Sequence, residues 1–113
     1  MNTNTNHEIS LQVAIEMTTR YRANKPNNFP ICETFSKAAI EKLLATTGCV
    51  SLRIYYGMKE NLEADAVIVA ANAEGEDILP PIVTTTLQGA DPLILEDGLR
   101  CPQDCPPASP LNP

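Results

Sequence analysis

The segment from Val50 to Ala71 reads VSLRIYYGMKENLEADAVIVAA and carries the clearest strand signals in the chain. In its first part every second residue is apolar, as in a half-exposed strand: Val50, Leu52, Ile54 and Tyr56. A polar loop follows at residues 57–63. Residues 64–71 are predominantly apolar, which is typical of a central strand buried on both faces. The stretch therefore predicts two strands, and it places the second one at the centre of a sheet.

Two helices are predicted before this stretch. The first begins at Ser10, a favourable N-cap residue, and extends to about Tyr21. Its polar residues gather in an arc of about 100°, and the rest of its circumference is mostly apolar. We therefore expect this helix either to be deeply buried or to share its second face with another chain. The segment from Asn24 to Pro30 is rich in Pro and Asn and ends the helix.

The second helix is expected to run from Thr34 or Ser36 to about Thr46. Its apolar residues gather on one side and its charged residues on the other, which is the pattern of an amphipathic helix that covers a flat surface. Gly48 stands where a residue in the left-handed conformation commonly follows a helix. Later in the chain, residues 72–77 predict a turn. Two further strands are expected at residues 82–87 and 93–95.

The order of helix, helix and then strands predicts an α+β fold. We expect two helices packed on one face of a small, mainly antiparallel sheet of three to four strands. The chain divides into a flexible N-terminus at residues 1–8, a single α+β domain at 9–98 and a Cys/Pro-rich tail at 99–113. Proline fixes the backbone and lacks an amide donor, so the tail is expected to be extended and to lie outside the core.

Four cysteines could form a metal or redox site: Cys32, Cys49, Cys101 and Cys105. Three residues separate Cys101 from Cys105, a spacing found in zinc half-sites. A four-thiolate zinc site would require the tail to fold back onto Cys32 and Cys49. The alternatives are a Cys101–Cys105 disulfide, a catalytic dithiol, or free thiols with Cys32 and Cys49 buried as small apolar residues. The simplest interpretation is free thiols without a cofactor.

The charge of the chain bears on its partners. The 113 residues include eight Lys and Arg against fourteen Asp and Glu, which gives a net charge of −6. Affinity for nucleic acid comes mostly from basic side chains that neutralise phosphates, so no nucleic-acid partner is expected. The longest strictly apolar run, at residues 66–71, is far shorter than the ~20 residues of a membrane-spanning helix, so no membrane span is expected. The N-terminus lacks the features of a secretory signal, which predicts a cytoplasmic protein.

Catalytic motifs are missing from the sequence. Its single histidine, His7, lies in the polar N-terminal stretch, and the sequence contains no phosphate-binding loop or nucleophile elbow. Three nearby carboxylates could act as an acid and a base: Glu60, Glu63 and Asp65. Carboxylates in a polar loop are usually solvated and keep ordinary pKa values. We therefore expect a protein that is not an enzyme.

Several segments resemble a group of small bacterial proteins of unknown function. The segments that carry the resemblance are Arg53–Met58, Asn72–Leu79, Arg100–Pro102, Cys105–Pro107 and Ser109–Asn112. The resemblance covers most of the chain after residue 10. It implies that the cysteine–proline tail is a feature of that group, and it assigns no activity.

These observations lead to one functional hypothesis and one alternative. The apolar surface of the first helix predicts a non-enzymatic interaction module, either a homo-oligomer such as a homodimer or a partner of another protein. The proline-rich tail supports this role, because preformed extended segments bind aromatic grooves. The alternative is zinc binding or thiol redox chemistry at Cys101 and Cys105.

Overall fold

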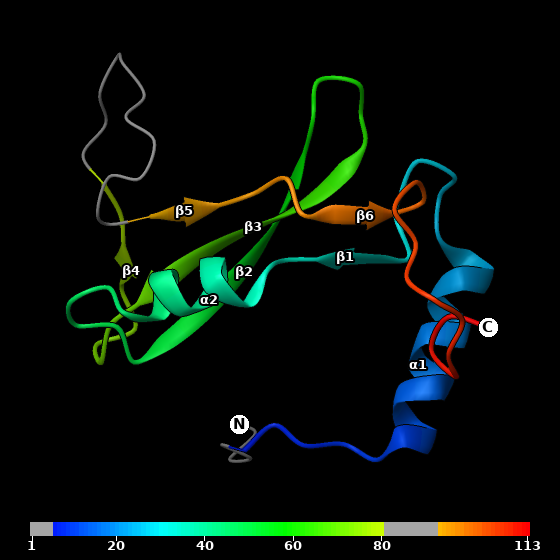
Figure 1. The fold of residues 1–113 in the computed structure, drawn as a ribbon, viewed down its shortest axis with the longest axis horizontal. Helices are drawn as coiled ribbons and strands as arrows, with labels where there is room; N and C mark the ends of the chain where they lie inside the picture. The colour runs from blue at the N-terminus through cyan, green and yellow to red at the C-terminus, as the bar shows by residue number, and fades with distance from the viewer. Residues whose placement is uncertain (1–5, 81–92) are drawn as a thin grey trace.

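The computed structural model describes residues 6–80 and 93–113, and these residues form two helices and six strands (Figure 1). In chain order the elements are α1 (Leu11–Asn24), β1 (Cys32–Thr34), α2 (Lys37–Leu44), β2 (Ser51–Met58), β3 (Ala64–Ala71), β4 (Asp77–Ile78), β5 (Ile94–Leu95) and β6 (Leu99–Cys101). The strands form a four-stranded sheet and a two-stranded sheet, and every pairing between them is antiparallel. The expected α+β class with a mainly antiparallel sheet is confirmed.

β3 is the central strand of the four-stranded sheet. β2 pairs with it along its full length on one edge. On the other edge, β4 pairs at Ala70 and Ala71, and β5 pairs at Ile68 and Val69. The side chains of these four residues are all buried. The prediction of a central strand at residues 64–71 is therefore confirmed, with the same bounds.

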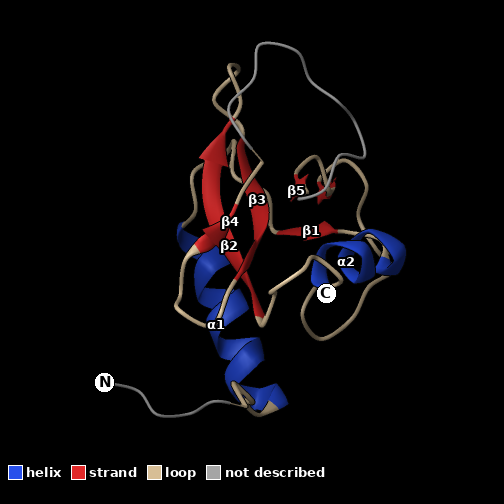
Figure 2. Cartoon of the chain, turned by 90° about the vertical axis from the view of Figure 1, so that its left-hand side faces the viewer, coloured by secondary structure: helices blue, strands red, loops and turns tan. Residues whose placement is uncertain are grey.

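α2 covers one face of this sheet and lies to one side of β2 and β3 in Figure 2. The helix begins as expected after Ser36, whose hydroxyl accepts a hydrogen bond from the Ala39 amide at 3.1 Å. Leu43 is fully buried against Ile68 and Ala70 at the centre of the core. Partly buried apolar side chains surround these three: Phe35, Ile40, Cys49, Ile78, Leu93 and Leu95. Burial of a side chain such as that of Leu43 contributes about 1.5–3 kcal/mol, so apolar packing holds α2 on the sheet.

α1 lies at the opposite end of the molecule from α2 (Figure 1). It begins after Ser10, as predicted, because the Ser10 hydroxyl accepts a hydrogen bond from the Val13 amide. None of its fourteen described residues is buried. Of the two helices expected on one face of the sheet, α2 alone packs there. The reason is that α1 leads into β1, and β1 belongs to the smaller sheet.

The two-stranded sheet pairs β1 with β6, which lie 69 residues apart at their first pair, Cys32 opposite Cys101. Glu33 lies opposite Arg100 in the same ladder. The sequence did not predict β1, because three residues are too few to display a period. Residues 99–101, which the composition places in the tail, form the strand β6, and its last residue, Cys101, is buried.

The rest of the tail makes defined contacts beside α1. Arg22 in α1 donates a hydrogen bond from Nη1 to the Leu111 carbonyl at 2.8 Å. Ser109 and Asn112 exchange two backbone hydrogen bonds, which close a small turn near the C-terminus. These contacts place the end of the chain against the first helix (Figure 1).

Some expectations fall on parts of the chain that the structure does not describe. The predicted strand at residues 82–87 lies outside the described residues, as does most of the N-terminal segment 1–8. The strand expected at residues 93–95 is present as β5. Within residues 6–80 and 93–113, no helix is long and apolar enough to cross a membrane.

Candidate functional site

A group of charged side chains joins the two sheets, and we call it the charged cluster: Glu33, Lys59, Glu63, Asp65 and Arg100. Glu33 and Arg100 are cross-strand neighbours in β1 and β6, and both reach β3. A Glu33 carboxylate oxygen accepts a hydrogen bond from the Ala66 amide at 3.0 Å. Arg100 Nη2 donates to the Ala64 carbonyl at 2.9 Å. These two bonds fix the small sheet against one end of β3.

Arg100 is the cation at the inner side of the charged cluster. Its Nη1 lies 2.5 Å from Glu63 Oε2, and its Nε lies 3.9 Å from Asp65 Oδ1. The Asp65 side chain is only 3% exposed, so its charge is largely removed from water. A buried carboxylate requires compensating positive charge. Arg100 supplies part of that compensation.

Lys59 supplies the rest. Its Nζ lies 3.1 Å from Asp65 Oδ2, 2.7 Å from Glu96 Oε2 and 3.3 Å from Asp97 Oδ1. The three carboxylates lie close enough together to hold a metal ion. In this structure the Lys59 ammonium contacts all three carboxylates and supplies one positive charge among them. The contacts of its ammonium group with the Glu96 and Asp65 carboxylates raise the pKa of Lys59, which keeps it charged.

Glu33 and Asp65 form a carboxyl pair with divergent pKa values. Burial, together with the neighbouring Asp65, raises the pKa of Glu33 to about 7. Burial also acts to raise the pKa of Asp65, but the contacts with Lys59 and Glu33 outweigh it and lower that pKa. Glu33 Oε2 is buried and has no hydrogen-bond partner among the described residues. A protonated Glu33 carboxyl would donate a hydrogen bond to the Asp65 carboxylate. The pair therefore favours the state in which it holds one proton and one negative charge.

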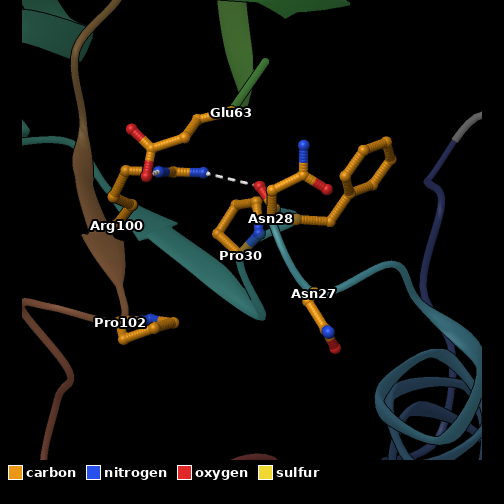
Figure 3. Close-up of a pocket in the computed structure, with 7 residues that line it drawn as sticks. Asn27, Asn28, Pro30, Glu63, Arg100 and Pro102 are labelled. Atoms are coloured by element: carbon orange, nitrogen blue, oxygen red, sulfur yellow. Dashed lines mark hydrogen bonds and ion pairs between the residues drawn. The ribbon is translucent and has the colours of Figure 1, made fainter. Parts of the chain in front are cut away.

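A small cavity opens beside Arg100, with a volume of about 40 Å³. Its lining residues are Asn27, Asn28, Phe29, Pro30, Glu63, Arg100 and Pro102. Figure 3 shows Arg100 between Glu63 and the Asn28 backbone, to whose carbonyl it donates at 3.4 Å. Sites for small molecules usually measure about 300–1,000 Å³. This cavity has room for one or two water molecules.

The carboxylates that the sequence put forward separate into two groups. Glu63 and Asp65 converge on Arg100, whereas Glu60 is exposed and belongs to no contact of the charged cluster. Sequence reasoning missed Glu33, whose neighbour Asp65 lies 32 positions away. A signal for Asp65 was present, because it is a charged residue inside an otherwise apolar strand.

The four cysteines occupy two places in the fold. Cys101 and Cys105 are joined by a disulfide, and Cys32 lies opposite Cys101 in the small sheet. Cys49 is a free thiol beside the apolar core, where its Sγ donates to the Ser51 carbonyl at 3.3 Å. Zinc binds thiolates, so a zinc site at Cys101 and Cys105 would require their reduced form. Zinc binding by the four cysteines stays a prediction.

Comparison with known proteins adds no relative to this description. No protein-family model, no curated protein and no solved structure matches the chain.

Proposed function

We propose that this protein is a self-associating module that pairs through the exposed edge of β2. The observation that supports the proposal is an eight-residue edge strand whose apolar side chains are largely exposed. Among the described strands, β2 pairs with β3 alone, so the backbone groups on its outer side have no strand partner. An edge of this kind is a template for another strand.

The apolar side chains of β2 extend beyond the area that α2 covers. Leu52 and Ile54 lie opposite Ala70 and Ile68, so they share the face of the sheet on which α2 packs. Their side chains nevertheless remain 38% and 48% exposed, and Tyr56 is 92% exposed. Exposed apolar side chains next to an open strand edge are typical of an interaction surface.

β2 also lacks the features that protect isolated edge strands. Natural edges carry charges, proline or bulges that discourage pairing. β2 contains no proline, and its single charged residue is Arg53. Arg53 Nη1 contacts Asp77 Oδ1 at 2.5 Å, and Tyr55 donates to the other oxygen of Asp77. The guanidinium is thus already neutralised within the chain.

The partner that we propose is a second copy of this chain, with the two β2 strands antiparallel about a two-fold axis. If the axis passes Ile54, then Ile54 lies opposite Ile54 of the second copy, and Leu52 lies opposite Tyr56 of the second copy. Arg53 then lies opposite Tyr55 of the second copy. Aliphatic–aromatic pairs stabilise sheets, and this register brings no like charges together.

α1 presents a second exposed apolar surface. This is the surface that the interaction expected from the sequence would use. Its exposed large side chains, with that of the residue before its N-cap, are Ile9, Leu11, Val13, Met17 and Tyr21. The strand edge is the better supported surface, because it combines apolar side chains with backbone groups that have no partner among the described strands. We keep the cytoplasm, the location expected from the sequence, as part of this proposal. Disulfides such as Cys101–Cys105 are usually transient in that compartment.

The test is sedimentation equilibrium of the wild type and of two variants with matched charge changes. We expect the wild type to be a dimer and Ile54→Lys to be a monomer, since the register places the two new ammonium groups opposite each other. Met17→Lys makes the same change on the exposed face of α1 and should remain a dimer. A monomeric wild type, or dissociation by Met17→Lys but not by Ile54→Lys, would refute pairing through β2.

A further inference from the structure

We propose that Cys32 exchanges with the Cys101–Cys105 disulfide, so that these three cysteines form an internal thiol–disulfide relay. Cys32 is a free thiol, and it is the direct cross-strand neighbour of Cys101. Figure 1 shows β1 and β6 side by side. The relay is independent of self-association, because β2 contributes no residue to it.

The strand register places Cys32 within bonding range of Cys101. Directly opposed residues of an antiparallel pair carry their side chains on the same face, with Cα atoms about 4.5–5.5 Å apart. A disulfide joins residues whose Cα atoms are about 4.4–6.8 Å apart. The Cα atoms of Cys101 and Cys105 are 4.4 Å apart. Cys101 can therefore bond to Cys105 or to Cys32 without a large movement of either strand.

The exchange is balanced within the chain. The Cys32 thiol loses its proton, and its sulfur attacks Sγ of Cys101. A Cys32–Cys101 bond forms, the Cys101–Cys105 bond breaks, and Cys105 leaves as a thiolate that takes up a proton. No electrons are gained or lost, so the step needs no external oxidant or reductant.

The three sulfurs differ in their access to solvent, so the exchange changes how exposed the free thiol is. Cys101 is 2% exposed, Cys32 is half-buried, and Cys105 is exposed. Exchange therefore moves the free thiol from a sheltered strand to the surface of the tail. At the surface, the Cys105 thiolate can attack a small-molecule disulfide such as oxidised glutathione, forming a mixed disulfide and releasing one thiol.

The chain is well suited to a direct test by alkylation and peptide mapping. Trypsin cuts after Lys and Arg except before Pro, so it separates Cys32 (residues 23–37), Cys49 (residues 43–53) and the pair Cys101 and Cys105 (residues 101–113). The native protein is treated with iodoacetamide in small portions at about pH 8, where thiolates are available, and is then unfolded and digested without reductant. Mass spectrometry identifies which peptides are joined.

The relay predicts that peptide 23–37 becomes joined to peptide 101–113, with the alkyl group on Cys105. Cys32→Ser should abolish the alkylation of Cys105, whereas the matched variant Cys49→Ser should leave it unchanged. The proposal is overturned if peptide 101–113 keeps its internal disulfide while Cys32 is alkylated. It is equally overturned if Cys105 is alkylated to the same extent in Cys32→Ser.

A second variant tests the proximity of Cys32 and Cys101 without the native disulfide. Cys105→Ser treated with oxidised glutathione should form a Cys32–Cys101 disulfide and release two equivalents of glutathione. Separate glutathione adducts on Cys32 and Cys101 would contradict the register argument. In Cys32→Ser and Cys105→Ser, alkylation of Cys49 at the wild-type rate shows that the apolar core has kept its structure.

Discussion

The two sheets of this molecule are stabilised by different interactions. Leu43, Ile68 and Ala70 pack together on the four-stranded sheet and bury apolar surface. At the two-stranded sheet, Arg100 compensates the buried charge of Asp65, and a disulfide ties Cys101 to Cys105. Apolar packing tolerates many arrangements of similar volume, whereas a buried ion pair depends on each partner. The two regions should therefore respond differently to mutation and to pH.

The largest effect on stability is expected in the apolar core of the four-stranded sheet. Leu43→Ala should lower the free energy of unfolding by about 3–4 kcal/mol, because it leaves a cavity under α2. Leu44→Ala is a matched control, since the next residue of the helix is 44% exposed and its loss should cost less than about 1 kcal/mol. Urea denaturation of both variants measures the difference. Equal losses would show that α2 does not pack as described.

In the charged cluster, Arg100→Met should lower the free energy of unfolding by about 2–3 kcal/mol, because it leaves Asp65 buried with less compensating charge. Lys37→Met removes a charge of the same sign from an exposed pair with Glu41, so it should change stability by less than about 0.5 kcal/mol. Urea denaturation again provides the measurement. If Arg100→Met proved as mild as Lys37→Met, the cluster would not hold the two sheets together.

The pH dependence of stability separates the two regions further. The pKa of Glu33 rises to about 7 in the fold, so the folded protein holds this proton more tightly than the unfolded chain does. Its contribution is fully present below about pH 4.5 and is lost as the pH rises through about 7. Glu33→Gln should therefore be more stable than the wild type by on the order of 2 kcal/mol at about pH 8.

That difference should disappear near pH 4, where Glu33 is protonated in both states. Thermal unfolding at several pH values measures it, and Glu60→Gln serves as the control because Glu60 is exposed. A constant difference between Glu33→Gln and the wild type from about pH 4 to 8 would show that Glu33 does not titrate as described.

The comparison of the two regions also explains which parts of the fold the sequence could predict. β3 was predicted with its bounds because a long apolar run is a local signal. The helix start at Ser10 follows from its cap, and Gly48 adopts the expected positive φ of 84°. Each of these features depends on interactions between residues close in sequence or on a regular period.

The charged region lacks such signals. β1 is three residues long, and its partner β6 lies in a segment that composition assigned to the tail. Glu33 meets Asp65, and Cys32 meets Cys101, only after the chain has folded. The pairing of a short strand with a distant one depends on tertiary structure. For that reason the sequence predicted the cysteine pair in the tail as one alternative and could not place Cys32 beside it.

Hydrogen–deuterium exchange at β2 tests pairing through this edge most directly. Backbone amides on the outer side of residues 51–58 have no partner among the described strands and would gain one in the dimer. We expect exchange in this segment to slow as protein concentration rises, and we expect Ile54→Lys to abolish the slowing. Exchange that is equally fast in dilute and concentrated wild-type protein would contradict it.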